Sequence, residues 1–121
     1  MALISRIDTI FVPAVDTTAA AAWYERMFGM TEIFRSAGHI GLRIAGEGGR
    51  STALTLIPVD HMPEQQYVAF NFFAPDIKAL HDALTEDGRD VTPINPHGAM
   101  SWFDFVDISG NRVNVCSFPE A

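Results

Sequence analysis

The chain has 121 residues, of which 48% are hydrophobic and 19% charged, and these fractions are typical of one globular domain of ordinary size. The net charge of −7, with eight basic residues scattered singly, argues against nucleic-acid binding, which needs clustered lysines and arginines. The single cysteine excludes an internal disulfide and no apolar run is long enough for a membrane span, so we expect a cytoplasmic protein without nucleic-acid or membrane partners.

The first half of the chain predicts one strand, one helix and three further strands. Residues 7–13 form a short β-rich run that we expect to end at Pro13. Asp16 is a suitable N-cap for an alanine-rich helix over 17–28, and Gly29 is a suitable stop. The expected strands lie at about 30–36, 39–45 and 51–58, with a glycine-rich turn at 46–49.

The second half repeats this order after a linker at about 59–66, which contains Pro63 and shows no periodicity. A strand is expected at 67–73, and Asp76 precedes a predicted helix over about 77–87 that Gly88 ends. The remaining strands are predicted near 90–94, 101–107 and 112–118.

The repeat predicts the fold class. Asp16 and Gly29 around the first helix are echoed by Asp76 and Gly88 around the second. A duplication of this kind indicates two similar modules, at about 5–60 and 66–119, within a single domain over 1–121. We therefore expect an α+β fold in which two βαβββ modules form a cup-shaped mixed β-sheet with the helices outside.

The alternation along the strands predicts which face of the sheet is polar. In the C-terminal hairpin, Phe103, Phe105, Val113 and Val115 share one apolar face, which we expect to pack beneath the helices. The opposite faces of the predicted strands are mixed, and a face of this kind lines a cleft or meets water. Its members are Thr9, Phe11, His39, Arg43, Tyr67, Asn71, Trp102, Asp104, Arg112 and Asn114.

Two short motifs, together with the duplicated order, resemble a known superfamily. The end of the first helix, 23–29 (Trp-Tyr-Glu-Arg-Met-Phe-Gly), resembles the aromatic helix end of vicinal oxygen chelate proteins. The hairpin at 107–114 (Asp-Ile-Ser-Gly-Asn-Arg-Val-Asn) resembles their Asp-x-x-Gly-Asn-x-x-Glu turn. The superfamily includes glyoxalase I, bleomycin-resistance proteins and extradiol dioxygenases, and the resemblance implies a homodimer.

The resemblance also implies four metal-ligand positions, at the start of the first strand and late in the fourth strand of each module. They fall on Thr9 and on Asn114, where a Glu is expected, and then on Tyr67 or Ala69 and on Ala53 or Thr55. These residue types include no imidazole, thiolate or carboxylate, so we expect no metal and no other cofactor.

The four histidines show no metal-binding spacing. His81, beside Asp82 on the second helix, is predicted to be a solvated helix residue, and His61 lies in the linker. An unconventional site that combines His39, His97 and Asp104 is an alternative that the spacing does not require. Cys116 is predicted to be a small buried hydrophobe.

The leading hypothesis is a metal-free, glyoxalase- or bleomycin-resistance-like protein that binds a small organic molecule, planar or cationic, in the cleft. Trp102 and the polar groups around Asp104 carry this hypothesis. The alternatives are a metal-dependent lyase, isomerase or dioxygenase of the same superfamily with non-standard ligands, and a structural or regulatory dimer whose cleft its own side chains fill. No catalytic residue is assigned.

Overall fold

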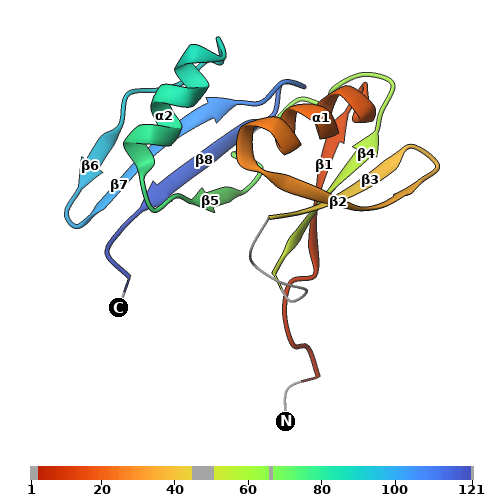
Figure 1. Ribbon diagram of the computed structural model, residues 1–121, viewed down its shortest axis with the longest axis horizontal. Helices are drawn as coiled ribbons and strands as arrows, with labels where there is room; N and C mark the ends of the chain where they lie inside the picture. The colour runs from red at the N-terminus through yellow and green to blue at the C-terminus, as the bar shows by residue number, and fades with distance from the viewer. Residues whose placement is uncertain (1–2, 45–50, 66, 121) are drawn as a thin grey trace. The chain divides into compact units, whose positions relative to one another are not determined.

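The computed structural model describes residues 3–44, 51–65 and 67–120 and divides into two compact units, Met1–Pro63 and Glu64–Ala121 (Figure 1). The turn predicted at 46–49 lies outside the described residues. Because each unit has its own sheet and its own helix, each is described by itself.

The first unit is a four-stranded mixed sheet in the order β1-β4-β3-β2. Its elements are β1 (Thr9–Ala14), α1 (Thr17–Phe28), β2 (Met30–Ser36), β3 (His39–Ile44) and β4 (Ala53–Pro58). β1 pairs parallel with β4, whereas β4 with β3 and β3 with β2 pair antiparallel. Pro13 lies inside β1 and does not end it, since β1 is an edge strand, where a missing N–H is tolerated.

The predicted caps of α1 are confirmed. The Asp16 carboxylate accepts a hydrogen bond of 3.0 Å from the backbone N–H of Ala19, which satisfies one of the unpaired donors of the first turn. Gly29 has a φ of 68°, the left-handed conformation in which glycine ends helices without strain.

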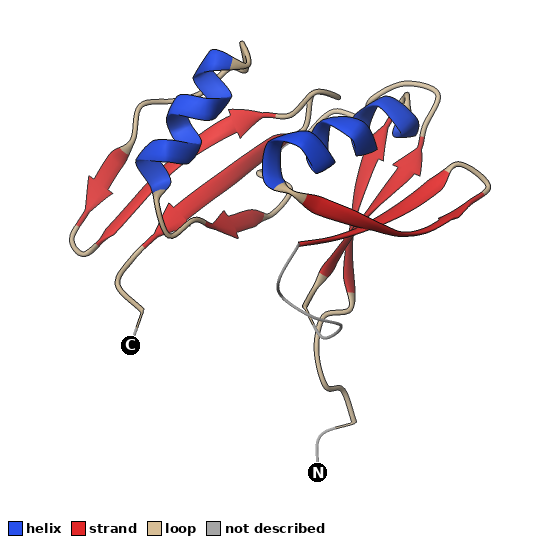
Figure 2. Ribbon diagram, viewed as in Figure 1, coloured by secondary structure: helices blue, strands red, loops and turns tan. Residues whose placement is uncertain are grey.

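α1 packs on all four strands of its sheet and buries one face of it (Figure 2). Val12, Ile40, Leu42 and Leu56 are at most 1% exposed, and Tyr24 of α1 is fully buried. The predicted alternation is therefore confirmed for β1 and β3. The residues between them on each strand lie on the other face, which carries the first candidate site.

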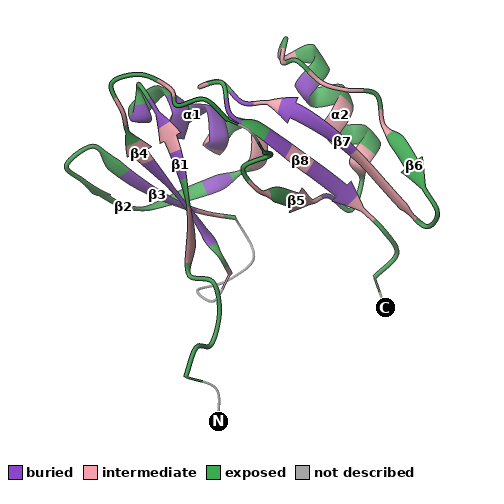
Figure 3. Ribbon diagram, turned by 180° about the vertical axis from the view of Figure 1, so that it is seen from behind, coloured by how far each residue is buried: buried purple, intermediate pink, exposed green. Residues whose placement is uncertain are grey.

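The second unit repeats the arrangement, with the sheet order β5-β8-β7-β6. Its elements are β5 (Asn71–Phe73), α2 (Ile77–Glu86), β6 (Asn95–His97), β7 (Met100–Val106) and β8 (Arg112–Ser117). α2 packs on β7 and β8, and the apolar face predicted for the hairpin is at most 1% exposed (Figure 3). Asp76 caps α2 through the N–H of Ala79, as predicted.

Two strand predictions of the second unit need correction. β5 is shorter than the predicted 67–73, although Ala69 still donates a backbone hydrogen bond to Arg112. The strand predicted near 90–94 is β6, at Asn95–His97, while Val91 makes only an isolated bridge to Phe105. Pro93 lacks an N–H and lies in the unpaired stretch between Val91 and β6, whereas Pro96 lies inside β6 and pairs with Ser101.

One buried carboxylate organises the turn between β7 and β8. Asp107 is 1% exposed and accepts hydrogen bonds from the backbone N–H groups of Ser109 and Asn111 and from the Asn111 side chain, at 2.8–2.9 Å. Gly110 has a φ of 104°, which favours glycine at this position. The Asp-x-x-Gly-Asn motif is therefore a structural device.

The fold class is α+β, with two βαβββ modules, as predicted. That the two modules together form a single domain remains a prediction. No helix within the described residues is long and apolar enough to cross a membrane.

Candidate functional site

The first candidate site is a hollow of about 500 Å³ on the first unit, lined by residues whose strand neighbours face α1. Four predicted site residues, Thr9, Phe11, His39 and Arg43, lie in its lining. The full lining consists of Asp8, Thr9, Phe11, Ile33, Phe34, Ser36, Ala37, His39, Arg43, Ala53 and Thr55.

A pair of threonine hydroxyls lies on the β1 and β4 side of this hollow. The Oγ1 atoms of Thr9 and Thr55 are 2.8 Å apart, within hydrogen-bond distance. Thr55 is only 3% exposed, so the pair supplies partly buried polar groups to the lining of the hollow. Each hydroxyl can both donate and accept a hydrogen bond.

Exposed apolar side chains form part of the lining of the hollow. Phe11 is 65% exposed, and Ile33 and Phe34 are each 44% exposed, which is unusual for side chains of this size. The β2–β3 register shifts between Glu32 and Phe34, so a bulge at Ile33 places it and the next residue toward the hollow together. The sequence-based face assignment included no residue of 30–36, and a regular strand would have placed only one of these two residues toward the hollow.

Gly41 makes the position of the Phe34 ring possible. The two residues face each other across β2 and β3, and a methyl group at Gly41 would overlap the ring. We expect Gly41→Ala to displace the ring and to lower the free energy of unfolding by about 1–2 kcal/mol.

A Phe34→Ala background provides the control, measured by urea denaturation. There, Gly41→Ala meets no ring, and alanine is favoured over glycine inside a strand by about 0.5–1 kcal/mol, so the sign of the effect should reverse. Equal losses in both backgrounds would contradict the contact.

Two side chains with nitrogen atoms, Arg43 and His39, also line the hollow. Arg43 is half-buried and donates from Nη1 to the backbone carbonyl of Ser51 at 3.0 Å. His39 is exposed, and its Nδ1 lies 3.4 Å from the carbonyl oxygen of Ala37. The nearby pair of Arg35 and Glu32 is a surface feature, in which the hydrogen bonds from Arg35 hold the pKa of the Glu32 carboxyl below its ordinary value.

The second candidate site is a hollow of about 370 Å³ on the second unit. It is lined by Thr92, Pro93, Ile94, Asn95, Pro96, Trp102, Asp104 and Arg112. A neighbouring hollow of about 310 Å³ shares Thr92, Asp104 and Arg112. Three residues predicted from the sequence, Trp102, Asp104 and Arg112, thus line the second hollow.

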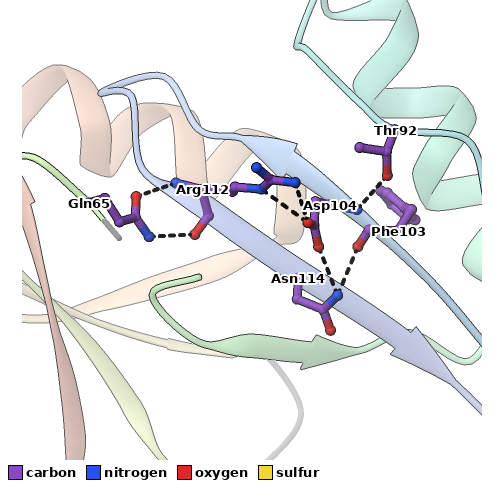
Figure 4. A network of polar contacts seen from close by, with 6 residues as sticks. All are labelled: Gln65, Thr92, Phe103, Asp104, Arg112 and Asn114. Carbon is purple, nitrogen blue, oxygen red and sulfur yellow. Dashed lines mark hydrogen bonds and ion pairs between the residues drawn. The ribbon is translucent and has the colours of Figure 1, made fainter. Parts of the chain in front are cut away.

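Asp104 is the centre of a polar network on this face (Figure 4). Its Oδ2 accepts from Nε and Nη2 of Arg112 at 3.0 and 2.8 Å, and its Oδ1 accepts from the Asn114 amide at 2.8 Å. The Asp104 side chain is 9% exposed, whereas that of Arg112 is 57% exposed. The carboxylate therefore fixes a guanidinium that remains open to a ligand.

Two residues that sequence analysis missed support this network. The Gln65 side chain accepts from the backbone N–H of Arg112 and donates to its carbonyl, as a neighbouring strand would (Figure 4). Thr92 exchanges hydrogen bonds with the backbone of Asp104 through its own N–H and its hydroxyl. No sequence motif marks either residue, because both act through backbone pairing.

The other predicted site residues lie outside these hollows. Tyr67 is 81% exposed and precedes β5, and the Asn71 amide lies 3.2 Å from Cys116 Sγ. Cys116 is 7% exposed, so its predicted burial is confirmed.

The prediction that His81 is a solvated helix residue is wrong. His81 is half-buried, its ring packs edge-on against Phe103 at 4.9 Å, and its Nε2 lies 2.9 Å from the carbonyl oxygen of Thr92. It therefore ties α2 to the segment that borders the second hollow. His61 is exposed in the linker, and His97 is exposed at the end of β6.

The repeat between the two units narrows the positions at which the resemblance to vicinal oxygen chelate proteins implies metal ligands. Thr9 lies seven residues before Asp16, and Ala69 lies seven before Asp76. The residue two positions after each of these pairs with the last strand of its own unit, Phe11 with Thr55 and Asn71 with Asn114. The four positions are therefore Thr9, Thr55, Ala69 and Asn114.

This set of two hydroxyls, one methyl and one amide does not fit zinc, iron, nickel or manganese, which prefer imidazole, thiolate and carboxylate ligands. Within residues 3–44, 51–65 and 67–120, no three His, Cys, Asp or Glu side chains form a group that could hold a metal ion. His39 belongs to the first unit and His97 and Asp104 to the second, so a site that combines them stays a hypothesis.

Solved structures with this fold are numerous. TnmS3, an antibiotic binding protein from Streptomyces sp. CB03234, aligns with a TM-score of 0.81 at 20% identity over 98% of this chain and 100% of its own. FosX, a fosfomycin resistance protein from Listeria monocytogenes, aligns with a TM-score of 0.80 at 17% identity over 97% and 96% of the two chains. A putative glyoxalase family protein from Bacillus anthracis aligns with a TM-score of 0.78 at 19% identity over 98% and 99%.

No curated protein matches the sequence. The model of the Glyoxalase/Bleomycin resistance protein/Dioxygenase superfamily matches residues 6–115, which is most of the chain. The family match, the duplicated βαβββ order and the Asp107 turn agree with one another. The chain therefore belongs to the Glyoxalase/Bleomycin resistance protein/Dioxygenase superfamily.

Proposed function

We propose that the protein binds a small planar organic molecule without the help of a metal ion. The observation that carries this proposal is the exposure of aromatic side chains beside partly buried polar groups on the sheet face opposite each helix. Phe11 and Phe34 accompany Thr9 and Thr55 on the first unit, and Trp102 accompanies Asp104 on the second. Hollows with apolar walls and a few fixed polar groups are typical of ligand sites.

The aromatic side chains would supply most of the affinity. Burial of apolar surface contributes about 25 cal/mol for each Å², and a flat ring offers this area with little loss of conformational entropy. Arg112, held by Asp104, would then orient the polar edge of the ligand. Burial and orientation are the two contributions that a binding protein needs.

The residues at the four superfamily ligand positions support a metal-free mechanism. Thr9 and Thr55 already bond to each other, and Ala69 has no donor atom. The neighbours TnmS3, an antibiotic binding protein, and FosX, a fosfomycin resistance protein, support a role in antibiotic binding or resistance. FosX, whose structure was solved in complex with Mn(II), does not support the metal-free part of the proposal.

Metal analysis of protein purified without a histidine tag or chelator tests the metal-free part of the proposal. We expect less than about 0.1 equivalent of zinc, iron, nickel or manganese, because the ligand positions lack the groups that bind these ions. Near-stoichiometric metal bound through protein side chains would refute a metal-free binder and favour a lyase, isomerase or dioxygenase.

A thermal-shift screen of planar organic molecules tests binding itself. A ligand at 100 times its Kd stabilises the folded state by about 2.7 kcal/mol, which shifts Tm by several degrees in a domain of this size. If no aromatic compound shifts Tm, the binding proposal is rejected and a structural or regulatory role is favoured.

We also propose that the protein acts as a homodimer in the cytoplasm. The superfamily membership and the exposed apolar side chains of the first unit favour a dimer, and the single cysteine suits a reducing compartment. Light scattering coupled to size exclusion should give twice the monomer mass of 13.3 kDa, and a monomer at micromolar concentration would contradict the dimer.

A further inference from the structure

The polar groups of the second hollow are predominantly hydrogen-bond donors. The Asp104 carboxylate is the strongest acceptor there, and Arg112 and Asn114 already occupy both of its oxygens. Its side chain is 9% exposed, so little of it can reach a ligand. The Asp104 carboxylate is therefore not free to pair with a cationic ligand.

Three donors, by contrast, are available. Two of the Arg112 nitrogens bond to Asp104, and within residues 3–44, 51–65 and 67–120 its Nη1 makes no hydrogen bond. In the same part of the chain, the indole N–H of Trp102 and the side-chain amide of Asn95 make none. Arginine presents its donors in a rigid planar fork, which suits oxygen acceptors.

The walls of the hollow favour a flat partner for these donors. Pro93, Ile94 and Pro96 offer apolar surface, and Trp102 offers an indole that is partly exposed. Trp102 and Asn95 pair directly across β6 and β7, so the ring and the amide lie side by side on one face. The neighbouring hollow contains Asp90, which makes no ion pair with Arg112 in the described chain.

We infer that the ligand of this hollow is a planar aromatic molecule whose edge carries an oxygen acceptor, a carboxylate or a carbonyl, which Arg112 binds while the ring lies against Trp102. This inference rests on the proposed binding function and names the ligand class. It reverses the charge preference suggested by the overall net charge of −7, because Arg112 and Asp104 determine the local chemistry.

The test uses three naphthalene probes that differ only in the group at position 2. They are 2-naphthoate, naphthalene-2-carboxamide and 2-naphthylmethylammonium, titrated into the full-length protein by calorimetry. We expect both acceptor probes to bind at least about tenfold more tightly than the ammonium probe, and a carboxylate preference over the carboxamide would identify an anionic group.

Arg112→Gln supplies the matched variant, because glutamine is too short to bond to Asp104 and a ligand together. Its affinity for the acceptor probes should fall about tenfold, whereas its affinity for the ammonium probe should rise, because the substitution frees the Asp104 oxygen that Arg112 occupies. Circular dichroism of the variant checks the fold, and the wild-type preference remains decisive if the variant fails to fold.

Two outcomes would overturn the inference about the ligand class, and neither of them would by itself reject the proposed binding function. Wild-type binding of the ammonium probe as tight as that of the acceptor probes would show that Arg112 does not select the ligand, although small-molecule binding would stand. Absence of binding for all three probes at millimolar concentration would also reject this ligand class, and the broad thermal-shift screen would then decide whether the protein binds any planar molecule.

Discussion

Asp107→Ala is expected to lower the free energy of unfolding by about 3 kcal/mol, the largest stability effect that we predict for one substitution. Asp107 is 1% exposed, and its carboxylate accepts from two backbone N–H groups and one side-chain amide. Its removal leaves these donors without their charged acceptor, and each costs about 1–3 kcal/mol when it is buried and unpaired. Water that enters at the exposed Gly110 should recover part of this loss.

Urea denaturation measures this effect, with two comparison variants. Asp107→Asn keeps one oxygen acceptor and should lose about half as much stability. Asp82→Ala removes an exposed carboxylate that pairs with Lys78 at 3.2 Å on the surface of α2, and it should change stability by less than about 0.5 kcal/mol. A loss below about 1 kcal/mol for Asp107→Ala would show that the turn does not depend on this side chain.

Trp102→Ala is expected to weaken binding of a planar aromatic ligand about 30-fold. Trp102 lines the second hollow and is partly exposed, and stacking of a ring on an aromatic side chain is worth about 1–3 kcal/mol by alanine substitution. The effect should appear as a higher Kd for every planar ligand, whatever its polar group, because the ring contact does not depend on that group.

Phe118→Ala is the aromatic control. Phe118 is 44% exposed and packs on Phe73 at 4.8 Å, outside the lining of the hollows. Calorimetric titration of this variant should give a Kd within about twofold of the wild type. Equal losses from Phe118→Ala and Trp102→Ala would place the ligand elsewhere on the protein.

Local physical signals were sufficient to predict the helices and the core face of the sheets. Asp16 and Asp76 cap helices because a carboxylate after a strand satisfies the free N–H groups of the next turn. The alternation of Phe103 and Phe105 identifies the buried face, because strand side chains alternate without exception in a regular ladder.

Features that depend on irregular or distant pairing were beyond such signals. The bulge at Ile33 changes which residues face the first hollow, and β6 begins only at Asn95, after Pro93. The bonds of Gln65 to the backbone of Arg112 join positions 47 residues apart, so no local pattern indicates them. His81 was predicted to be solvated because Phe103 and Thr92, its partners, come from elsewhere in the fold.

The sequence predicted which residues share the open face, but it did not predict how they bond to one another. Seven of the ten predicted residues lie in the two hollows, and these are Thr9, Phe11, His39, Arg43, Trp102, Asp104 and Arg112. Strand parity predicted that they lie opposite the helix-covered face, but it did not reveal that Asp104 holds Arg112 with two hydrogen bonds.

The shared strand order of the two units has a consequence for how such a protein diversifies. Both sheets keep the same order, yet the matching positions Thr55 and Asn114 carry different chemistry. Because side chains alternate between faces, substitutions on the open face leave the contacts with the helix untouched. Each half of the duplication can therefore acquire its own specificity while the other half, and the scaffold beneath both, remains unchanged.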